Sequence, residues 1–111
     1  MDRQAGPQIV SVAVGVGTTA AFVNEKFAGG LILPETGWTG LTSFTFTVCP
    51  TVDGTYAPLL DDAGAAVSVA VTPGSASPLP NEVALAPFFK AVGNVVVPAG
   101  SAKTVTCMLK S

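Results

Sequence analysis

The chain has 111 residues, of which 49% are hydrophobic and only 11% charged, and its formal net charge is −2. A domain of this length cannot bury so much apolar surface by itself, because small domains have a high surface-to-volume ratio, so we expect patches that another chain covers. The five basic residues are scattered, which argues against nucleic-acid binding and against an electrostatic membrane anchor.

Residues 1–8 are predicted to form an N-terminal arm, and residues 9–111 a single domain. From Gln8 onward, valines alternate with small residues, which predicts a strand that continues to Val16. The same stretch is the most apolar of the chain, but glycine and threonine interrupt it before the roughly 18 residues that a spanning helix needs. Its period of two also does not fit a signal peptide. We therefore expect no targeting segment.

Leu31 to Leu33 predicts a short buried strand, which Pro34 ends. The loop over residues 34–44 follows, and it holds Trp38 between two glycines. A tryptophan in this position is interpreted as a lid over one end of the core; a platform on which a ligand stacks is the alternative. Residues 41–49 alternate β-branched and aromatic side chains with others, and they form the clearest predicted strand.

The second half of the chain continues with short strands and turns. Strands are predicted over residues 55–60, 66–72, 95–97 and 103–109, with turns at 51–54 and 61–64 and a Pro/Ser-rich loop over 72–82. Residues 84–91, which include Phe88 and Phe89, are predicted to form a short helical turn or an irregular segment. About seven to eight short strands with Gly/Pro turns predict an all-β fold, an antiparallel β-sandwich of jelly-roll or immunoglobulin-like type, with a small barrel as the alternative.

Cys49 and Cys107 could form one disulfide. Alternation places Cys107 on the core face of its strand, whereas Cys49 lies on the more polar side with Thr45 and Thr47, so two free thiols are favoured. No Cys-x-x-Cys spacing supports a zinc site or a redox motif.

Catalytic chemistry finds little support. The chain has no histidine, which excludes Ser-His-Asp and Cys-His nucleophile activation. No Gly-Lys pair occurs, so the phosphate-binding loop is absent. The acidic residues lie mostly in predicted turns, where a solvated surface role is the simpler interpretation.

Asp53, Asp61 and Asp62 are the candidate ligands for a calcium site. The predicted strand over 55–60 would hold the two turns about 20 Å apart, at about 3.3 Å per residue. The three carboxylates therefore cannot share one ion, and two alone fall short of the oxygens that calcium takes. No metal and no cofactor is expected.

A series of short motifs spans residues 29–111: Leu31–Pro34, Trp38–Thr39, Phe44–Val48, Asp53–Tyr56, Leu60–Gly64, Val67–Val71 and Thr104–Lys110. In this order they resemble a family of small virion proteins of tailed bacteriophages and prophages. The chain departs from that pattern over residues 80–97, where "APFFKAVGNVVV" stands in place of an arginine-containing strand.

The resemblance implies a non-enzymatic capsid decoration, or cement, protein. Such a protein binds the major capsid protein or another virion protein, forms a small homo-oligomer with a trimer favoured, and resides in the virion after assembly in the host cytoplasm. The alternatives are a neck adaptor between head and tail, a tail- or fibre-associated module, and a carbohydrate-binding sandwich that uses Trp38 and Tyr56.

Residues expected to contact a partner fall into three groups. The arm contributes polar side chains, one strand face is small and weakly polar, and the third group is aromatic. They are Arg3, Gln4, Trp38, Thr45, Thr47, Ser68, Ala70, Phe88 and Phe89.

Overall fold

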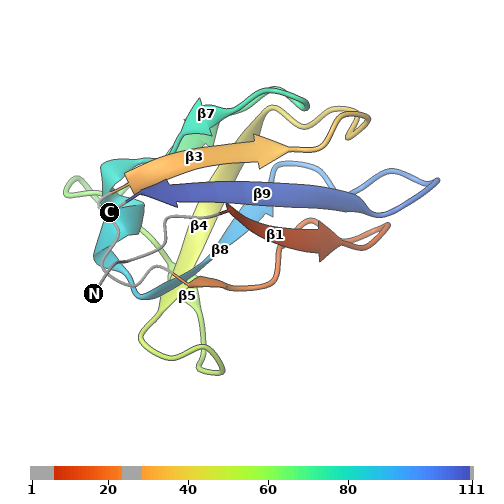
Figure 1. Cartoon of the computed structure of the whole chain (residues 1–111). Helices are drawn as coiled ribbons and strands as arrows, with labels where there is room; N and C mark the ends of the chain where they lie inside the picture. Colours follow the sequence, from red (N-terminus) through yellow and green to blue (C-terminus); the bar gives the residue numbers. More distant parts are fainter. Residues whose placement is uncertain (1–6, 24–28, 111) are drawn as a thin grey trace.

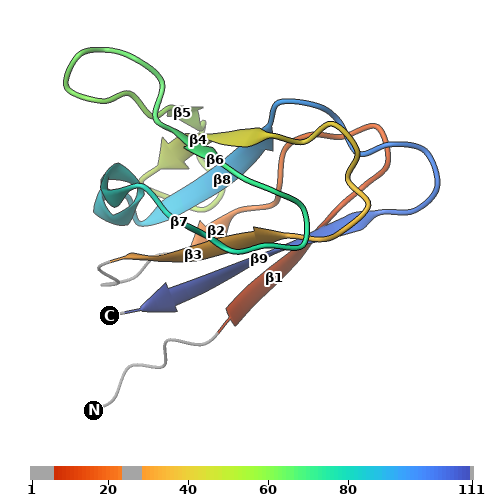
Figure 2. The ribbon, with the colours of Figure 1, turned by 90° about the horizontal axis from the view of Figure 1, so that it is seen from above.

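A computed structural model describes residues 7–23 and 29–110, and their strands form two antiparallel sheets that pack face to face (Figure 1, Figure 2). The strands of the two sheets cross steeply in Figure 1, and the sheets form separate layers in Figure 2. The predicted all-β sandwich is therefore confirmed, and the closed barrel is not formed.

The first sheet has four strands, in the order β1 (Pro7–Val12), β9 (Lys103–Lys110), β3 (Gly29–Pro34) and β7 (Ser77–Pro78). Strand β9 lies in its middle and pairs along its length with β1 and β3. Its residues alternate, so that Val105 and Cys107 are buried while Thr104, Thr106 and Met108 lie on the opposite face.

The second sheet has five strands. Its main order is β2 (Phe22–Val23), β8 (Phe88–Gly93), β4 (Ser43–Cys49) and β5 (Ala57–Pro58), and β6 (Ser68–Ala70) also pairs with β4. Strand β4 turns Phe44 and Phe46 into the core and Thr45 and Thr47 outward, as the alternation predicted.

The core lies between the two sheets and is rich in aromatic rings. Phe89 of β8 stacks on Phe22 of β2 with ring centroids 5.2 Å apart, and it also meets Phe46 edge-on at 6.1 Å. These pairs contribute stability beyond the area that they bury. Aliphatic side chains from both sheets complete the core, among them Val12, Ile32, Val67, Val71, Val97 and Val105.

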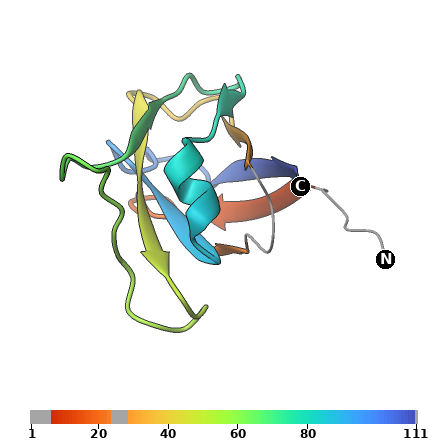
Figure 3. The ribbon, with the colours of Figure 1, turned by 90° about the vertical axis from the view of Figure 1, so that its left-hand side faces the viewer.

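Opposite ends of the sandwich are closed in different ways. At one end Trp38 is fully buried and packs edge-on against Phe44, with ring centroids 5.8 Å apart. Gly93 packs closely against the indole. A side chain at this position would crowd the ring, because its Cβ would stand 3.1 Å from Trp38 Cζ2. The other end is covered by the 3-10 helix η1 (Asn81–Leu85), through the buried Val83 (Figure 3). The lid interpretation of Trp38 is thus confirmed.

One side chain links the two sheets at their β1–β2 edge. Gln8 Nε2 donates to the carbonyl oxygen of Val23 at 2.6 Å, and the Val23 amide donates to Gln8 Oε1 at 2.9 Å. Pro7 and Gln8, which were predicted to belong to the arm, are therefore part of strand β1.

Several predicted elements are corrected by the structure. The first strand ends at Val12 and not at Val16, and the strand predicted over 55–60 is reduced to β5. Residues 84–91, predicted as helical or irregular, contain most of β8, which pairs with β4. Residues 95–97 form no strand, and only Val97 makes an isolated bridge, to Val14.

Across the described ranges, no helix has the length and apolar character needed to cross a bilayer.

Candidate functional site

Trp38 is not available to a ligand. Its indole is fully buried, and its Nε1 donates to the carbonyl oxygen of Val95 at 3.3 Å. A shallow hollow of about 250 Å³ opens beside the loop, lined by Gly37, Trp38, Thr39, Gly40, Leu41 and Pro73. This volume lies below the usual range of small-molecule pockets, and no charged group lines the hollow. The stacking platform considered from the sequence is therefore not formed.

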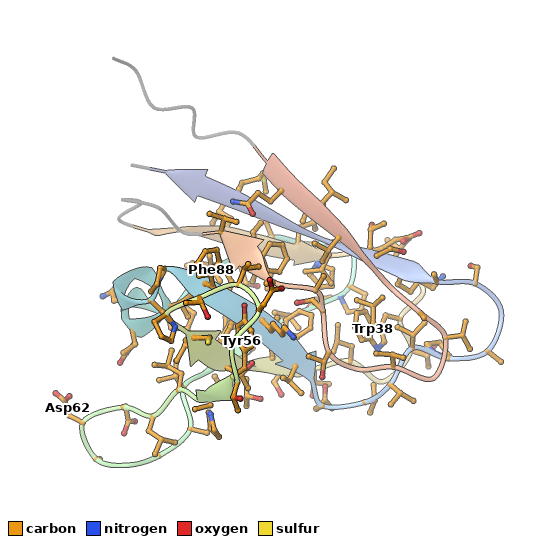
Figure 4. The ribbon with its side chains drawn as sticks, turned by 90° about the horizontal axis from the view of Figure 1, so that it is seen from below. Trp38, Tyr56, Asp62 and Phe88 are labelled. Carbon is orange, nitrogen blue, oxygen red and sulfur yellow. The ribbon has the colours of Figure 1, made fainter. Side chains whose placement is uncertain are left out.

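Asp61 stabilises the turn in which it lies. Asp61 Oδ1 accepts hydrogen bonds from the backbone amides of Ala63 at 2.9 Å and Ala65 at 3.0 Å. This is the way an aspartate stabilises a turn, and Gly64 supplies the required positive φ of 84°. Figure 4 shows Asp62 at the tip of this loop, well away from Tyr56 and Trp38. Within residues 7–23 and 29–110, no cluster of three or more metal-ligating side chains occurs.

The small, weakly polar face predicted as a partner surface exists. Thr45 lies between Ser68 and Val92, and Thr47 lies between Pro58 and Lys90, so these residues share the outer face of the five-stranded sheet. Ser68 and Ala70 are exposed, while Thr45 and Thr47 are half-buried. The geometry brings this group together, and its contact with a partner stays a prediction.

The other predicted contact residues are separated. Phe89 is fully buried in the core and cannot touch a partner, because it follows the inward positions of β8. Phe88, on the outward side of the same strand, is half-buried. Arg3 and Gln4 lie outside the described residues.

The turn after β4 folds over the outer face of its own sheet. Cys49 points to the side of Thr45 and Thr47, yet it is only 5% exposed. Gly54 lies against it so closely that a Cβ there would overlap Cys49 Sγ and stand 2.6 Å from Thr51 Oγ1. The prediction that Cys49 shares a face with Thr45 and Thr47 is confirmed, but the turn buries its thiol there.

Tyr56 and Lys90 also contact each other next to the turn after β4. Lys90 Nζ lies 4.3 Å from the centroid of the Tyr56 ring, which is a cation–π contact. The Tyr56 hydroxyl donates to the carbonyl oxygen of Val52 at 3.0 Å. Desolvation, with smaller effects from Cys49 and Asp53, raises the pKa of Tyr56, so the phenol stays neutral. With one ring face occupied by Lys90, Tyr56 is a poor stacking surface for a sugar.

Both cysteines are free, as predicted. Cys107 is fully buried on the core face of β9, and burial raises the pKa of its thiol well above the usual range. A neutral thiol in an apolar core behaves as a small hydrophobic group, so Cys107 is structural and not nucleophilic.

The outer face of the four-stranded sheet carries exposed apolar side chains, and nothing in the described chain covers them. Ile9 is 63% exposed and Leu31 39%, while Leu33 and Met108 are half-buried. Strand pairing places Ile9 and Leu33 on either side of Thr106, and Leu31 beside Met108. We call Ile9, Leu31, Leu33, Thr106 and Met108 the sheet patch.

A second apolar surface lies at the end of the sandwich near Trp38. Val14, Val16 and Val96 are 45%, 42% and 54% exposed. Their two loops are joined by backbone hydrogen bonds, from Gly15 to Val97 at 2.9 Å and from Val97 to Val16 at 3.0 Å. Residues 11–23 and 91–102 contain no charged residue. We call these three valines the end patch.

Neither patch was predicted residue by residue. Leu31 to Leu33 is a continuous apolar run, which looks like a strand buried on both faces, and Val14 and Val16 continue the period of the buried Val12. The available signal was global: an apolar content too high for the size of the chain. No family model, curated protein or solved structure matches the chain.

Proposed function

We propose that this protein is a non-enzymatic structural component of a phage virion, a decoration protein that binds the assembled coat lattice. The observation that carries the proposal is the pair of uncovered apolar surfaces, the sheet patch and the end patch, on a small domain. Isolated apolar side chains are normal on a surface, but contiguous apolar patches mark sites of protein contact. The motif resemblance supplies the virion context.

The arrangement suits attachment better than chemistry. The acidic side chain of Asp61 is occupied by backbone amides, the thiols are buried, and the chain has no histidine. A protein that binds the assembled shell and not its separate subunits stabilises the shell by mass action. The end patch lies on two loops that backbone hydrogen bonds join, so little conformational freedom is lost when a partner covers it.

The test is the copy number and position of the chain in intact particles, measured by quantitative mass spectrometry and by imaging of labelled particles. Hundreds of copies distributed over the shell are expected. About six, twelve or a few dozen copies confined to one vertex or to the tail would indicate the neck or tail alternative, because ring components follow the symmetry of that axis. Particles that lack the chain would contradict any virion role.

A binding assay tests the mechanism separately. Shells stripped of the protein are incubated with purified chain and sedimented, and wild type is compared with Val96→Lys and Val52→Lys. Both substitutions change an exposed valine, at 54% and 48% exposure, but only Val96 belongs to the end patch. Selective loss of binding by Val96→Lys is expected; equal binding by both variants would contradict a role for the end patch.

A further inference from the structure

We propose that the sheet patch is a self-association surface, on which a second copy of this chain packs its own sheet patch face to face about a two-fold axis. The inference rests on the proposed structural role and specifies which surface joins two copies.

The face has the shape and chemistry of an interface between sheets. Sheets pack through apolar outer faces about 10 Å apart, and here Ile9, Leu33 and Met108 project from neighbouring strands around Thr106. Among the side chains that the structure describes on this face, Glu35 is the single charged one, and it stands at the end of β3. Its Oε1 accepts a 2.7 Å hydrogen bond from the Thr104 amide.

The occupant follows from charge and from area. A partner face rich in charge would be desolvated against apolar side chains without compensation, whereas a second copy offers the same apolar centre, with Glu35 at its edge. The four strands have six, eight, six and two residues, so at about 3.3 Å per residue and about 4.8 Å between strands they cover roughly 350 Å². Two such faces bury about 700 Å², the size of a weak interface, so the association is expected to depend on concentration.

The position of Glu35 selects the direction of the axis. An axis that runs across the strands near Thr106 makes the two β9 strands antiparallel and carries the two Glu35 side chains to opposite ends of the interface. An axis along β9 would bring both carboxylates to the same end. An isologous pair of this kind is closed, so the expected unit is a dimer and not the trimer that the resemblance favoured.

The first experiment measures self-association by analytical ultracentrifugation over a concentration series. Wild type is expected to form a concentration-dependent dimer, and Ile9→Lys should raise its dissociation constant at least tenfold. Leu31→Gln is the second, milder variant, and an unchanged thermal unfolding midpoint shows that each variant is folded. Val52→Lys is the matched control, since Val52 is also exposed, at 48%, but belongs to neither patch, and it should leave the dissociation constant unchanged.

The second experiment identifies the face directly. Thr106→Cys places a thiol near the proposed axis, and Thr45→Cys places one at a half-buried threonine in the middle of the other sheet. A short bismaleimide should cross-link two copies of Thr106→Cys and not two copies of Thr45→Cys. The native thiols are buried and serve as an internal background.

The outcomes separate this inference from the proposed function. A chain that stays monomeric at all concentrations, or that dimerises equally well as Ile9→Lys and Leu31→Gln, overturns the self-association surface even if the chain decorates shells. A dimer that forms through the sheet patch but never binds particles upholds the surface and refutes the virion role.

Discussion

The two outer faces of the sandwich are finished differently. The outer face of the five-stranded sheet carries Thr45, Thr47 and Ser68, and the turn after β4 folds back over part of it to bury Cys49. The outer face of the four-stranded sheet carries Ile9, Leu31 and Met108 and has no such cover in the described chain. One sheet completes its own surface, while the other leaves apolar area for a second molecule.

Both outer faces rest on the core between the sheets. A substitution in that core should lower the free energy of unfolding more than any other change considered below. Phe46→Ala removes a fully buried ring that packs edge-on against Phe89, and should lower the free energy of unfolding by about 3–5 kcal/mol. Thr47→Ala changes the next residue of the same strand, which lies on the outer face. It should change the free energy of unfolding by less than about 1 kcal/mol. Urea unfolding followed by Trp38 fluorescence measures both, and similar losses would contradict the assignment of the two faces.

The cover of the five-stranded sheet can be broken at Gly54. A Cβ at this position would overlap Cys49 Sγ and crowd Thr51, so Gly54→Ala should destabilise the fold by about 1–3 kcal/mol. The reaction of Cys49 with a thiol reagent should also accelerate, because the turn no longer closes over it.

Gly17→Ala is the control for this change. Its new Cβ would meet neighbouring atoms at 3.5 Å or more, which is ordinary contact. The free energy of unfolding and the rate of thiol modification should both stay near the wild-type values. If Gly54→Ala behaves in the same way, the turn is not what buries Cys49.

The buried thiol of Cys107 should make the free energy of unfolding depend on pH. Burial raises the pKa of Cys107, so the unfolded chain loses this proton at a lower pH than the folded protein does. The stabilisation is therefore complete below the unfolded value of about 8.5 and declines as the pH rises above it, by about 1.4 kcal/mol at pH 9.5. Unfolding of wild type and Cys107→Ala at pH 7 and 9.5 should show this extra decline only in wild type.

The smallest expected effect concerns Lys90. Lys90→Met keeps most of the side chain's length and removes the charge over the Tyr56 ring, which should lower the free energy of unfolding by about 0.5–1 kcal/mol. Lys103→Met is the comparison on the other sheet. A larger effect of Lys90→Met at high salt than at low salt would contradict an electrostatic contact, because salt screens exposed charges.

Sequence patterns predicted the fold where alternation was clean. Val67, Val69 and Val71 share a face, and β4 and β9 occur where predicted. Strand β8 was missed because Phe88 and Phe89 are adjacent large apolar residues, which hide the alternation of buried and half-buried positions. The strand predicted to Val16 ends at Val12 because residues 13–17 turn to bond with Val97, a long-range contact that a local period cannot reveal.

The candidate surfaces were harder to predict than the fold. The face with Thr45, Thr47, Ser68 and Ala70 was assigned correctly from alternation. The sheet patch was not, because apolar residues on an outer face look in the sequence like residues of a core. Only the strand pairing, which joins residues 9, 31 and 106 from distant parts of the chain, brings that patch together.

The contact between Gln8 and Val23 makes one carboxamide a hydrogen-bonded link between β1 of one sheet and β2 of the other. Its nitrogen donates and its oxygen accepts, so a single side chain takes the place of a missing ladder between β1 and β2. Deamidation of Gln8 would replace the donor by a negative charge facing a carbonyl oxygen. Deamidation should therefore weaken the contact between β1 and β2. Faster deuterium uptake at the Val23 amide would record this change.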